Sequence, residues 1–139
     1  MAWPAATYLF ALAASAAVVM IDKPVTVEMI VPEAVRHSKI VLLQLEEVLV
    51  RRNAPAVWNV FWDMPEANAQ SSVNGVHFVG YIALVANSAN RDPKPAGFTM
   101  QLPPAALVAL RRQRTVRFTF VPVRKLPEGG VTITTLRLE

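Results

Sequence analysis

The stretch that decides the fold closes the chain, where residues 115–139 read TVRFTFVPVRKLPEGGVTITTLRLE. In its first part, Val116, Phe118 and Phe120 alternate with polar residues, which is the period of a strand with one buried face and one wet face. The run at 125–130 holds a proline and two glycines, which favour a reversal of the chain. A second strand then follows, so this stretch predicts a β-hairpin.

The last strand changes phase along its length. Its first two apolar residues, Val131 and Ile133, occupy odd positions, and its last two, Leu136 and Leu138, occupy even positions. Successive side chains of a strand point to opposite faces, so all four share a face only if one extra residue is inserted between the pairs. We therefore predict a β-bulge at residues 134–135.

The composition is that of one folded domain. The 139 residues are 53% apolar and 17% charged, which is too apolar for a disordered chain and long enough to bury a core. The lack of cysteine excludes disulfides, thiolate nucleophiles and zinc–thiolate or iron–sulfur sites. A net charge of +4 permits contact with an acidic partner, but the basic excess is mild, and we interpret it as a loosely basic surface.

Residues 1–21 form an apolar lead-in without a charged side chain, ahead of a β-sandwich domain at residues 22–139. The run at 8–19 has the apolar character of a secretory signal, with small residues at 14–16 for cleavage, but no lysine or arginine precedes it. Secretion follows if residues 1–17 act as a signal. Otherwise the lead-in is ordered or packed on a partner, and the compartment is open. The segment is too short and too rich in alanine to predict a membrane span.

Five more strands and one helix are expected between the lead-in and the closing pair. Residues 40–50 fit a helical stripe as well as a strand, but their β-branched content favours a strand broken near Glu46 and Glu47. Pro103 and Pro104 open a short helix. We predict strands at 25–31, 40–50, 57–62, 76–86 and 98–102, and a helix at 105–112. This order predicts a mainly β fold, an antiparallel β-sandwich of about seven strands with the helix before the penultimate strand.

Two of these strands carry unusual patterns. In residues 57–62, Val57 and Phe61 point to one face and two tryptophans point to the other, which indicates a strand that is buried on both sides or reaches a partner. In residues 76–86, the even-numbered residues point inward. Gly80 in the middle of that strand indicates a bulge or the close approach of another side chain.

Few residues could carry catalysis. Only two histidines occur, His37 in a polar loop and His77 on the outward face of its strand, and we interpret both as surface residues rather than metal ligands. No serine lies in a nucleophile elbow, and no phosphate-binding loop occurs. Glu46 and Glu47 are adjacent, so they lie on opposite faces and are not placed for paired acid and base work. The sequence therefore predicts no catalytic, cofactor-binding or metal-binding residue, and an independent enzyme would need a cleft in which His77 meets a carboxylate.

The basic residues concentrate between Arg111 and Lys125. Aromatic residues nearby raise the alternative of a nucleic-acid surface, but Phe118 and Phe120 alternate with Arg117 and serve a core better than base stacking. We interpret this concentration as a solvated helix end and strand face, and we predict no nucleic-acid partner.

The large apolar side chains exceed what one small sandwich needs to bury. Trp58, Trp62 and Met64, together with the lead-in, therefore predict a docking face. The alternative is an ordinary core with one exposed tryptophan.

Several sequence blocks occur in a fixed order: VVMIDKPVTV at 18–27, WNVFWD at 58–63, FVGYI at 78–82, a Leu-Pro-Pro helix start at 102–104, VRFTFVP at 116–122 and VTITTL at 131–136. In this order they resemble the C-terminal β-sandwich domain of tyrosinases and polyphenol oxidases. The resemblance covers residues 18–139, and it rests on the order of the blocks rather than on any one of them.

The resemblance implies a covering role. In that family the domain packs over a separate helical domain, in which six histidines hold two copper ions that oxidise phenols to quinones. A side chain of the sandwich can sit in the entrance and keep the enzyme latent. Two histidines do not replace six, so the resemblance implies a copper site on another chain, or on a part of a precursor outside this sequence.

We therefore expect a non-catalytic lid, shielding or chaperone-like partner of a histidine-rich helical catalytic domain. Trp58, Trp62 and Met64 are the docking or entrance-plugging candidates. The alternative is a free-standing β-sandwich that binds protein or carbohydrate.

Overall fold

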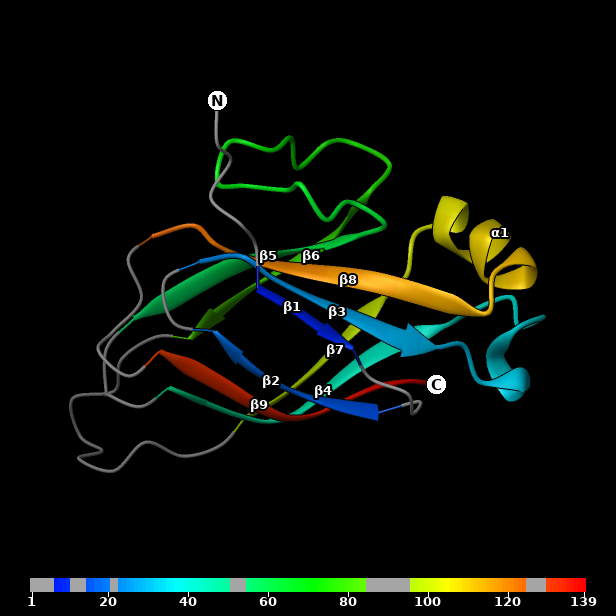
Figure 1. The fold of residues 1–139 in the computed structure, drawn as a ribbon, viewed down its shortest axis with the longest axis horizontal. Coiled ribbons are helices and arrows are strands. Elements are labelled where there is room, and N and C mark those ends of the chain that lie inside the picture. The colour runs from blue at the N-terminus through cyan, green and yellow to red at the C-terminus, as the bar shows by residue number, and fades with distance from the viewer. Residues whose placement is uncertain (1–6, 11–14, 21–22, 51–54, 85–95, 125–129) are drawn as a thin grey trace.

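The fold is a sandwich of two β-sheets with one helix at one end (Figure 1). The computed structural model describes residues 7–10, 15–20, 23–50, 55–84, 96–124 and 130–139. The first sheet has the strand order β1-β3-β8-β5-β6, and the second has the order β2-β9-β4-β7. The elements are β1 (Thr7–Phe10), β2 (Ser15–Met20), β3 (Val25–Ile30), η1 (Glu33–Val35), β4 (Leu42–Val50), β5 (Ala56–Trp62), β6 (Phe78–Leu84), β7 (Ala96–Gln101), α1 (Pro104–Arg112), β8 (Thr115–Pro122) and β9 (Val131–Leu138). Of the described strands, the seven from β3 to β9 follow the lead-in, so the predicted sandwich is confirmed.

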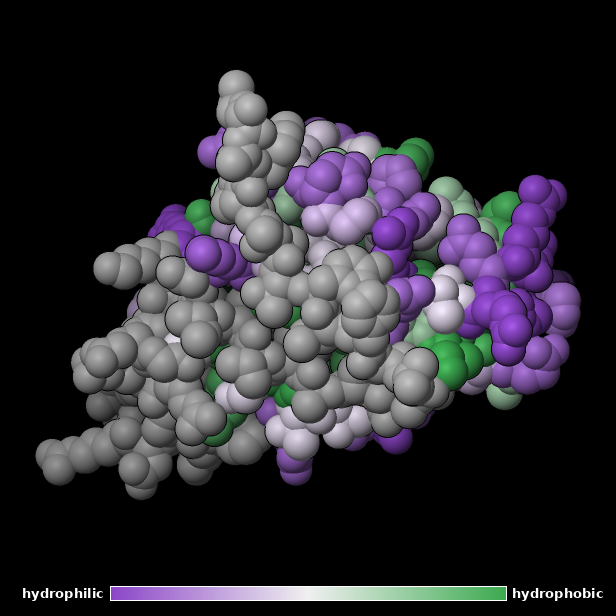
Figure 2. All heavy atoms as spheres, viewed as in Figure 1, coloured by the Kyte–Doolittle hydropathy of each residue, from purple (hydrophilic) through white to green (hydrophobic). Residues whose placement is uncertain are grey.

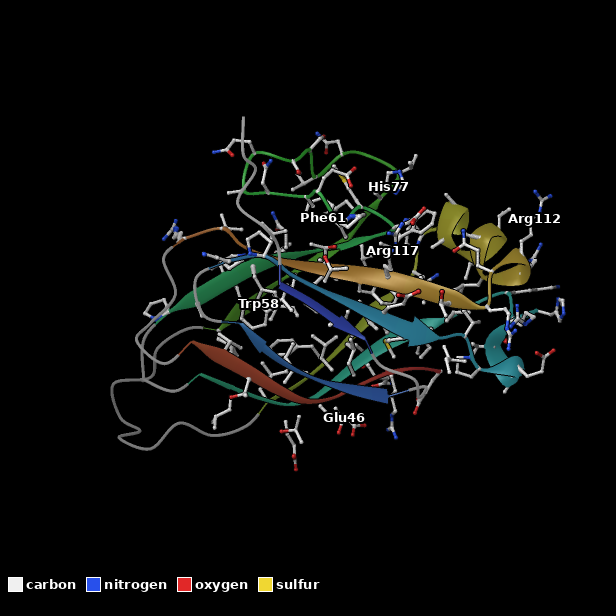
Figure 3. All side chains as sticks on the ribbon, viewed as in Figure 1. Glu46, Trp58, Phe61, His77, Arg112 and Arg117 are labelled. Carbon is white, nitrogen blue, oxygen red and sulfur yellow. The ribbon has the colours of Figure 1, made fainter. Side chains whose placement is uncertain are left out.

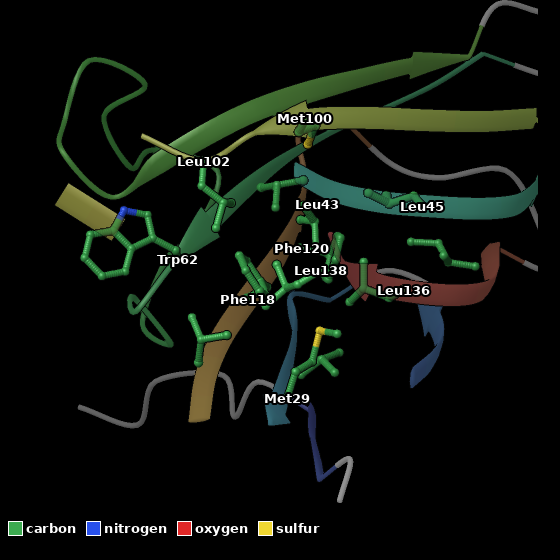
Figure 4. Packing of buried hydrophobic residues seen from close by; sticks show 14 of the residues in the cluster. Met29, Leu43, Leu45, Trp62, Met100, Leu102, Phe118, Phe120, Leu136 and Leu138 are labelled. Carbon is green, nitrogen blue, oxygen red and sulfur yellow. The ribbon is translucent and has the colours of Figure 1, made fainter. Parts of the chain in front are cut away.

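The core lies between the two sheets, where the predicted strand patterns place their apolar residues (Figure 4). On β3, Val25, Val27 and Met29 are at most 3% exposed. On β8, Phe118 and Phe120 are fully buried. Alternation in the sequence therefore identified the inner face of both strands correctly.

The predicted bulge in β9 is present. Ala16 of β2 lies opposite Leu136. Val18, two residues later, lies opposite Ile133, so β9 has one residue more than β2 over this step. The predicted break in β4 is its counterpart, because β4 has one extra residue relative to β7 at the same level, and Glu47 there has a φ of 53°. Between β4 and β9 the register is unbroken, so both strands keep their apolar faces on the core.

The closing strands do not form the predicted hairpin. β8 pairs with β3 and β5 in the first sheet, whereas β9 pairs with β2 and β4 in the second. Most of the predicted turn at 125–130 lies outside the described residues, although Gly130 has the positive φ, 71°, that was expected of it. Alternation identifies the buried face of a strand but not its neighbour, because strands of either sheet turn their apolar residues toward the same core.

The lead-in supplies a strand to each sheet. β1 runs parallel to β3 at the edge of the first sheet, and β2 runs antiparallel to β9 at the edge of the second. Both strands lie on the same side of the sandwich, since β2 also contacts β3. Within the described ranges, no helix has the length and apolar content needed to cross a lipid bilayer.

The predicted helix is present as α1 and begins one residue earlier than expected, at Pro104. Proline suits the first helical turn because the N–H it lacks would have no partner there. Ala106 and Leu110 are buried against the core, and Leu107 is partly buried. The helix therefore closes one end of the sandwich.

β6 is shorter than predicted and changes phase at its start. The register against β5 slips by one residue between Gly80 and Phe78, so Val79 is the extra residue of a bulge. Phe78 consequently packs outside the main core, and Val79 packs against it. The inward placement of Val76 was wrong, because this residue precedes the strand and is 64% exposed. One inserted residue inverts the phase of everything before it.

Gly80 also makes the predicted close approach. A Cβ at this position would lie 3.2 Å from the Cε atom of Met100, a side chain of β7 in the opposite sheet. β6 and β7 are edge strands on the same side of the sandwich. Glycine therefore leaves room for Met100 between the two edges.

Candidate functional site

The loop between β5 and β6, residues 63–77, folds over the outer face of the first sheet (Figure 3). It closes a second, smaller core that consists of Phe61, Ala67 and Val121, with Met64 and Phe78 partly buried beside them. The rings of Phe61 and Phe78 meet edge to face, with centroids 5.6 Å apart. Strand β5 is thus buried on both sides, as predicted, and its second cover comes from this chain.

Next to the small core, the outer face of β8 is buried, whereas the sequence predicted a solvent-exposed face. Thr119 and Thr26 are fully buried, and their hydroxyl oxygens share a hydrogen bond of 2.9 Å. The pairing explains how two polar side chains are accommodated away from water. Only Arg117, nearer the start of β8, brings a charge to this strand face, at the foot of the 63–77 loop.

The two ends of the 63–77 loop are joined through Trp62 and His77. The backbone N–H of Trp62 donates to the carbonyl oxygen of His77 at 2.8 Å, and the His77 Nδ1 lies 3.0 Å from the carbonyl oxygen of Trp62. A carbonyl only accepts hydrogen bonds, so Nδ1 carries the proton in this pair. The indole N–H of Trp62 also donates to the carbonyl oxygen of Val76 at 2.8 Å.

His77 is therefore a half-buried structural residue and not the plain surface histidine that was predicted. Its ring centroid lies 5.0 Å from that of Trp62. His37, by contrast, is exposed, as predicted. Within the described residues, no three histidine, aspartate or glutamate side chains gather closely enough to hold a metal ion.

Asp63, the first residue of the loop, is fixed by Arg117. Its φ is 48°, which places a non-glycine residue in the left-handed region. Its backbone N–H donates to the carbonyl oxygen of Arg117 at 2.9 Å, and the Arg117 Nη2 donates to its Oδ1 at 2.8 Å. The side chains are 35% and 37% exposed, so this ion pair contributes about 1 kcal/mol or less. Its main effect is to set the direction in which the loop leaves β5.

The rest of the loop is shaped by its own turns and exposes two valines. The side chains of Asn68 and Ser72 each accept a hydrogen bond from the backbone N–H two residues further on, at 2.8 and 3.1 Å. Val73 and Val76 are 46% and 64% exposed. The loop thus presents apolar side chains on a backbone that is already ordered.

Two of the three predicted docking residues lie inside the fold. Trp58 is fully buried and Trp62 is 5% exposed, so both rings belong to the main core rather than to a docking face. Met64 is partly buried in the small outer core. The surplus of large apolar residues is used by that second core, which sequence reasoning missed. Its signal was the apolar residues at outward positions of β5 and β8, Phe61 and Val121.

The outer face of the second sheet is polar and internally paired. The Thr99 hydroxyl donates to Gln44 Oε1 at 3.1 Å, and Gln44 Nε2 donates to Glu139 Oε2 at 3.1 Å. Arg137 pairs with both Glu139 and Glu46. The two adjacent glutamates of β4 are thus solvated residues at a bulge, as predicted. This face suits water better than an apolar partner.

A polar hollow of about 390 Å³ lies at the foot of the 63–77 loop. It is lined by Glu28, Asp63, Gln113, Arg114, Thr115 and Arg117. Both carboxylates are engaged, because the Thr115 hydroxyl donates to Glu28 at 2.8 Å and Asp63 pairs with Arg117. The hollow can recognise polar groups through charge and hydrogen bonds.

No protein-family model and no curated protein matches the sequence. Solved structures match the fold. The chain is similar to latent apple tyrosinase, with a TM-score of 0.69 and 16% identity over 97% of this chain. It is similar to latent aurone synthase (polyphenol oxidase) from its natural source, with a TM-score of 0.65 and 14% identity over 87% of this chain. It is also similar to the recombinantly expressed latent aurone synthase, with a TM-score of 0.61 and 12% identity over 87% of this chain.

The chain spans 29% of the apple tyrosinase chain and 25% of each aurone synthase chain. The similarity therefore concerns one part of those proteins. At these identities it establishes a shared fold, and at that level the resemblance to tyrosinases and polyphenol oxidases is confirmed.

Proposed function

We propose that this chain is a non-catalytic cover for a dicopper phenol oxidase. Its partner would be a histidine-rich helical catalytic domain, carried on another chain or elsewhere in a longer protein, and both copper ions would belong to that partner. The observation that supports the proposal is the shared fold: two enzymes described as latent contain this architecture in about a quarter of their length.

The 63–77 loop is the surface that suits the covering role best. It exposes Val73 and Val76, and its base is fixed by the hydrogen bonds of Trp62 and by Asp63. An ordered loop loses little conformational entropy on docking, which favours binding. Seated over an apolar entrance, the two valines would exclude water and substrate. The polar outer face of the second sheet would remain in solvent.

The proposal is tested with a histidine-rich helical protein that co-purifies with this chain. We expect its oxidation of catechol to fall when the chain is added, and to recover when Val73→Lys and Val76→Lys are introduced together. Val123→Lys together with Ile40→Lys is the matched control, because both residues are exposed, both lie outside the 63–77 loop and the two added charges are the same in number.

Two outcomes would refute the covering role. In the first, the partner's catechol oxidation, copper content and solubility are all unchanged by the chain. In the second, the isolated chain binds two copper ions and oxidises catechol with nothing added.

A second candidate is a free-standing β-sandwich that binds protein or carbohydrate. The burial of Trp58 and Trp62 favours it, because the tryptophans that would dock on a large partner are used within the fold. Analytical ultracentrifugation distinguishes the two: a chain that stays monomeric beside the catalytic protein supports the second candidate.

A further inference from the structure

Three exposed arginines lie together where α1 ends and β8 begins. Arg111, Arg112 and Arg114 are exposed, and none of their side chains forms a hydrogen bond or ion pair with another described residue. We call these three residues the arginine patch. Figure 2 shows hydrophilic side chains gathered at the end of the molecule that carries α1, and Arg112 points away from the helix in Figure 3.

The patch is not needed to terminate the helix. Arg36, from the segment after η1, already serves that end: its Nη1 donates to the carbonyl oxygens of Leu110 at 3.3 Å and Gln113 at 2.9 Å. Cations near a helix C-terminus are favourable, but the effect is small at exposed positions. The three guanidinium groups are therefore available for an external partner.

The charges around the patch favour carboxylates as ligands. Arg36 pairs with Glu33 at 3.1 Å, and Arg117 pairs with Asp63 at 2.8 Å, so these two acidic groups are already balanced by other arginines. Arginine binds carboxylates through two parallel hydrogen bonds where geometry allows, which makes it selective for them.

The hollow beside the patch favours a polypeptide over a nucleic acid. Arg114 belongs to the arginine patch and also lines the hollow. Gln113 adds a further polar group to the hollow. Glu28 and Asp63 also line the hollow, so an uncharged polar side chain suits it better than a phosphate or a carboxylate does. Tyr81 is the one exposed large aromatic residue among the described ones, and it lies on β6 rather than at this end. Base stacking therefore has no platform here.

We propose that the arginine patch binds an acidic segment of a partner polypeptide. Glutamate or aspartate side chains pair with Arg111 and Arg112, and a neighbouring polar side chain enters the hollow beside Arg114. This inference rests on charge and geometry at the α1 end and does not depend on the covering role of the 63–77 loop.

The test uses a short fluorescein-labelled peptide rich in glutamate and serine, with binding followed by fluorescence anisotropy at low salt. We expect Arg111→Gln with Arg112→Gln to weaken binding about tenfold, the effect of losing two exposed ion pairs. The matched control is Lys23→Gln with Arg124→Gln. These two exposed cations lie at the opposite end of β3 and β8 from Arg114, as the pairing of Val25 with Phe120 and of Ile30 with Thr115 shows.

Both double variants remove two positive charges and lower the net charge from +4 to +2, so they differ only in position. The control should bind the peptide within about twofold of the parent protein. An equal loss in both variants would overturn the proposal, because it would reflect net charge alone. A single-stranded oligonucleotide that binds as tightly as the peptide and is weakened equally by the patch variant would also overturn it, as would the absence of peptide binding.

Discussion

Replacing each buried tryptophan of β5 by phenylalanine should give two different results, although the substitution is the same. Trp58 is fully buried, and its indole N–H has no hydrogen-bond partner among the described residues. Trp62 is 5% exposed, and its indole N–H donates to the carbonyl oxygen of Val76 at 2.8 Å. The pair of variants therefore separates the loss of ring volume, which both share, from the contribution of the indole N–H.

The expected magnitudes follow from these surroundings. Complete truncation of a buried aromatic side chain costs about 3–5 kcal/mol, so trimming an indole to a phenyl ring should cost roughly 1–2 kcal/mol at either site. At Trp58 the change also removes an unpaired buried donor, which is destabilising by about 1–3 kcal/mol. The two effects offset each other, so Trp58→Phe should keep its free energy of unfolding within about 1 kcal/mol of the parent. Trp62→Phe also loses a hydrogen bond and should lose about 2–3 kcal/mol.

Urea unfolding followed by far-ultraviolet circular dichroism measures both variants, because this signal does not depend on the tryptophan that was removed. Trp62→Phe should show the lower urea midpoint, with a melting temperature below that of Trp58→Phe by roughly 5–10 °C. A Trp58→Phe protein that loses as much stability as Trp62→Phe would refute the reasoning. It would mean that the indole N–H of Trp58 has a partner in solution, such as a buried water.

Three further changes test other parts of the fold. Asp63→Gly should be less destabilising than Asp63→Ala by about 1 kcal/mol, because both variants lose the ion pair with Arg117 but only glycine adopts a positive φ freely. Equal urea midpoints for the two variants would contradict the assigned conformation. Gly80→Ala should lower the free energy of unfolding by less than about 1 kcal/mol, since the atom nearest the added Cβ is the flexible end of the Met100 side chain. A loss above about 2 kcal/mol in calorimetry would mean that the backbones themselves clash. Deleting residues 1–20 should leave the edges of β3 and β9 unpaired and cause self-association in light scattering, whereas a monomeric truncated protein of parental stability would show that β1 and β2 contribute nothing.

The position of a β-bulge could be predicted from the sequence only where residues of the main core lie on both sides of the bulge. In β9, Ile133 and Leu136 both face the main core, so the inserted residue could be located from the sequence. In β6, Gly80 indicated a bulge or a close approach, and a bulge lies next to it, but its effect on the direction of the preceding residues was not predicted. Phe78 and Val76 are both apolar, but neither lies in the main core. Phe78 packs in the small outer core, and Val76 faces solvent.

The sequence also predicted which strand faces are apolar more clearly than it predicted which segments cover them. Local alternation predicted that β5 is buried on two sides, and it is. The second cover is the 63–77 loop, whose polar composition gave little sign that Ala67 would be buried in it. The docking role of Trp58 and Trp62 was inferred from a surplus of apolar residues, and the structure uses that surplus internally. Which residues meet across the fold depends on long-range pairing that local patterns do not contain.

The pairing of β2 with β9 has a consequence for biosynthesis. β2 is translated well before β9, which is its only described neighbour in the second sheet. Until β9 has been translated, the apolar segment that becomes β2 has no strand to pair with in the second sheet. High contact order of this kind slows folding. The nascent chain should therefore depend on a holdase chaperone, or on slow translation, more than a protein built from local hairpins does.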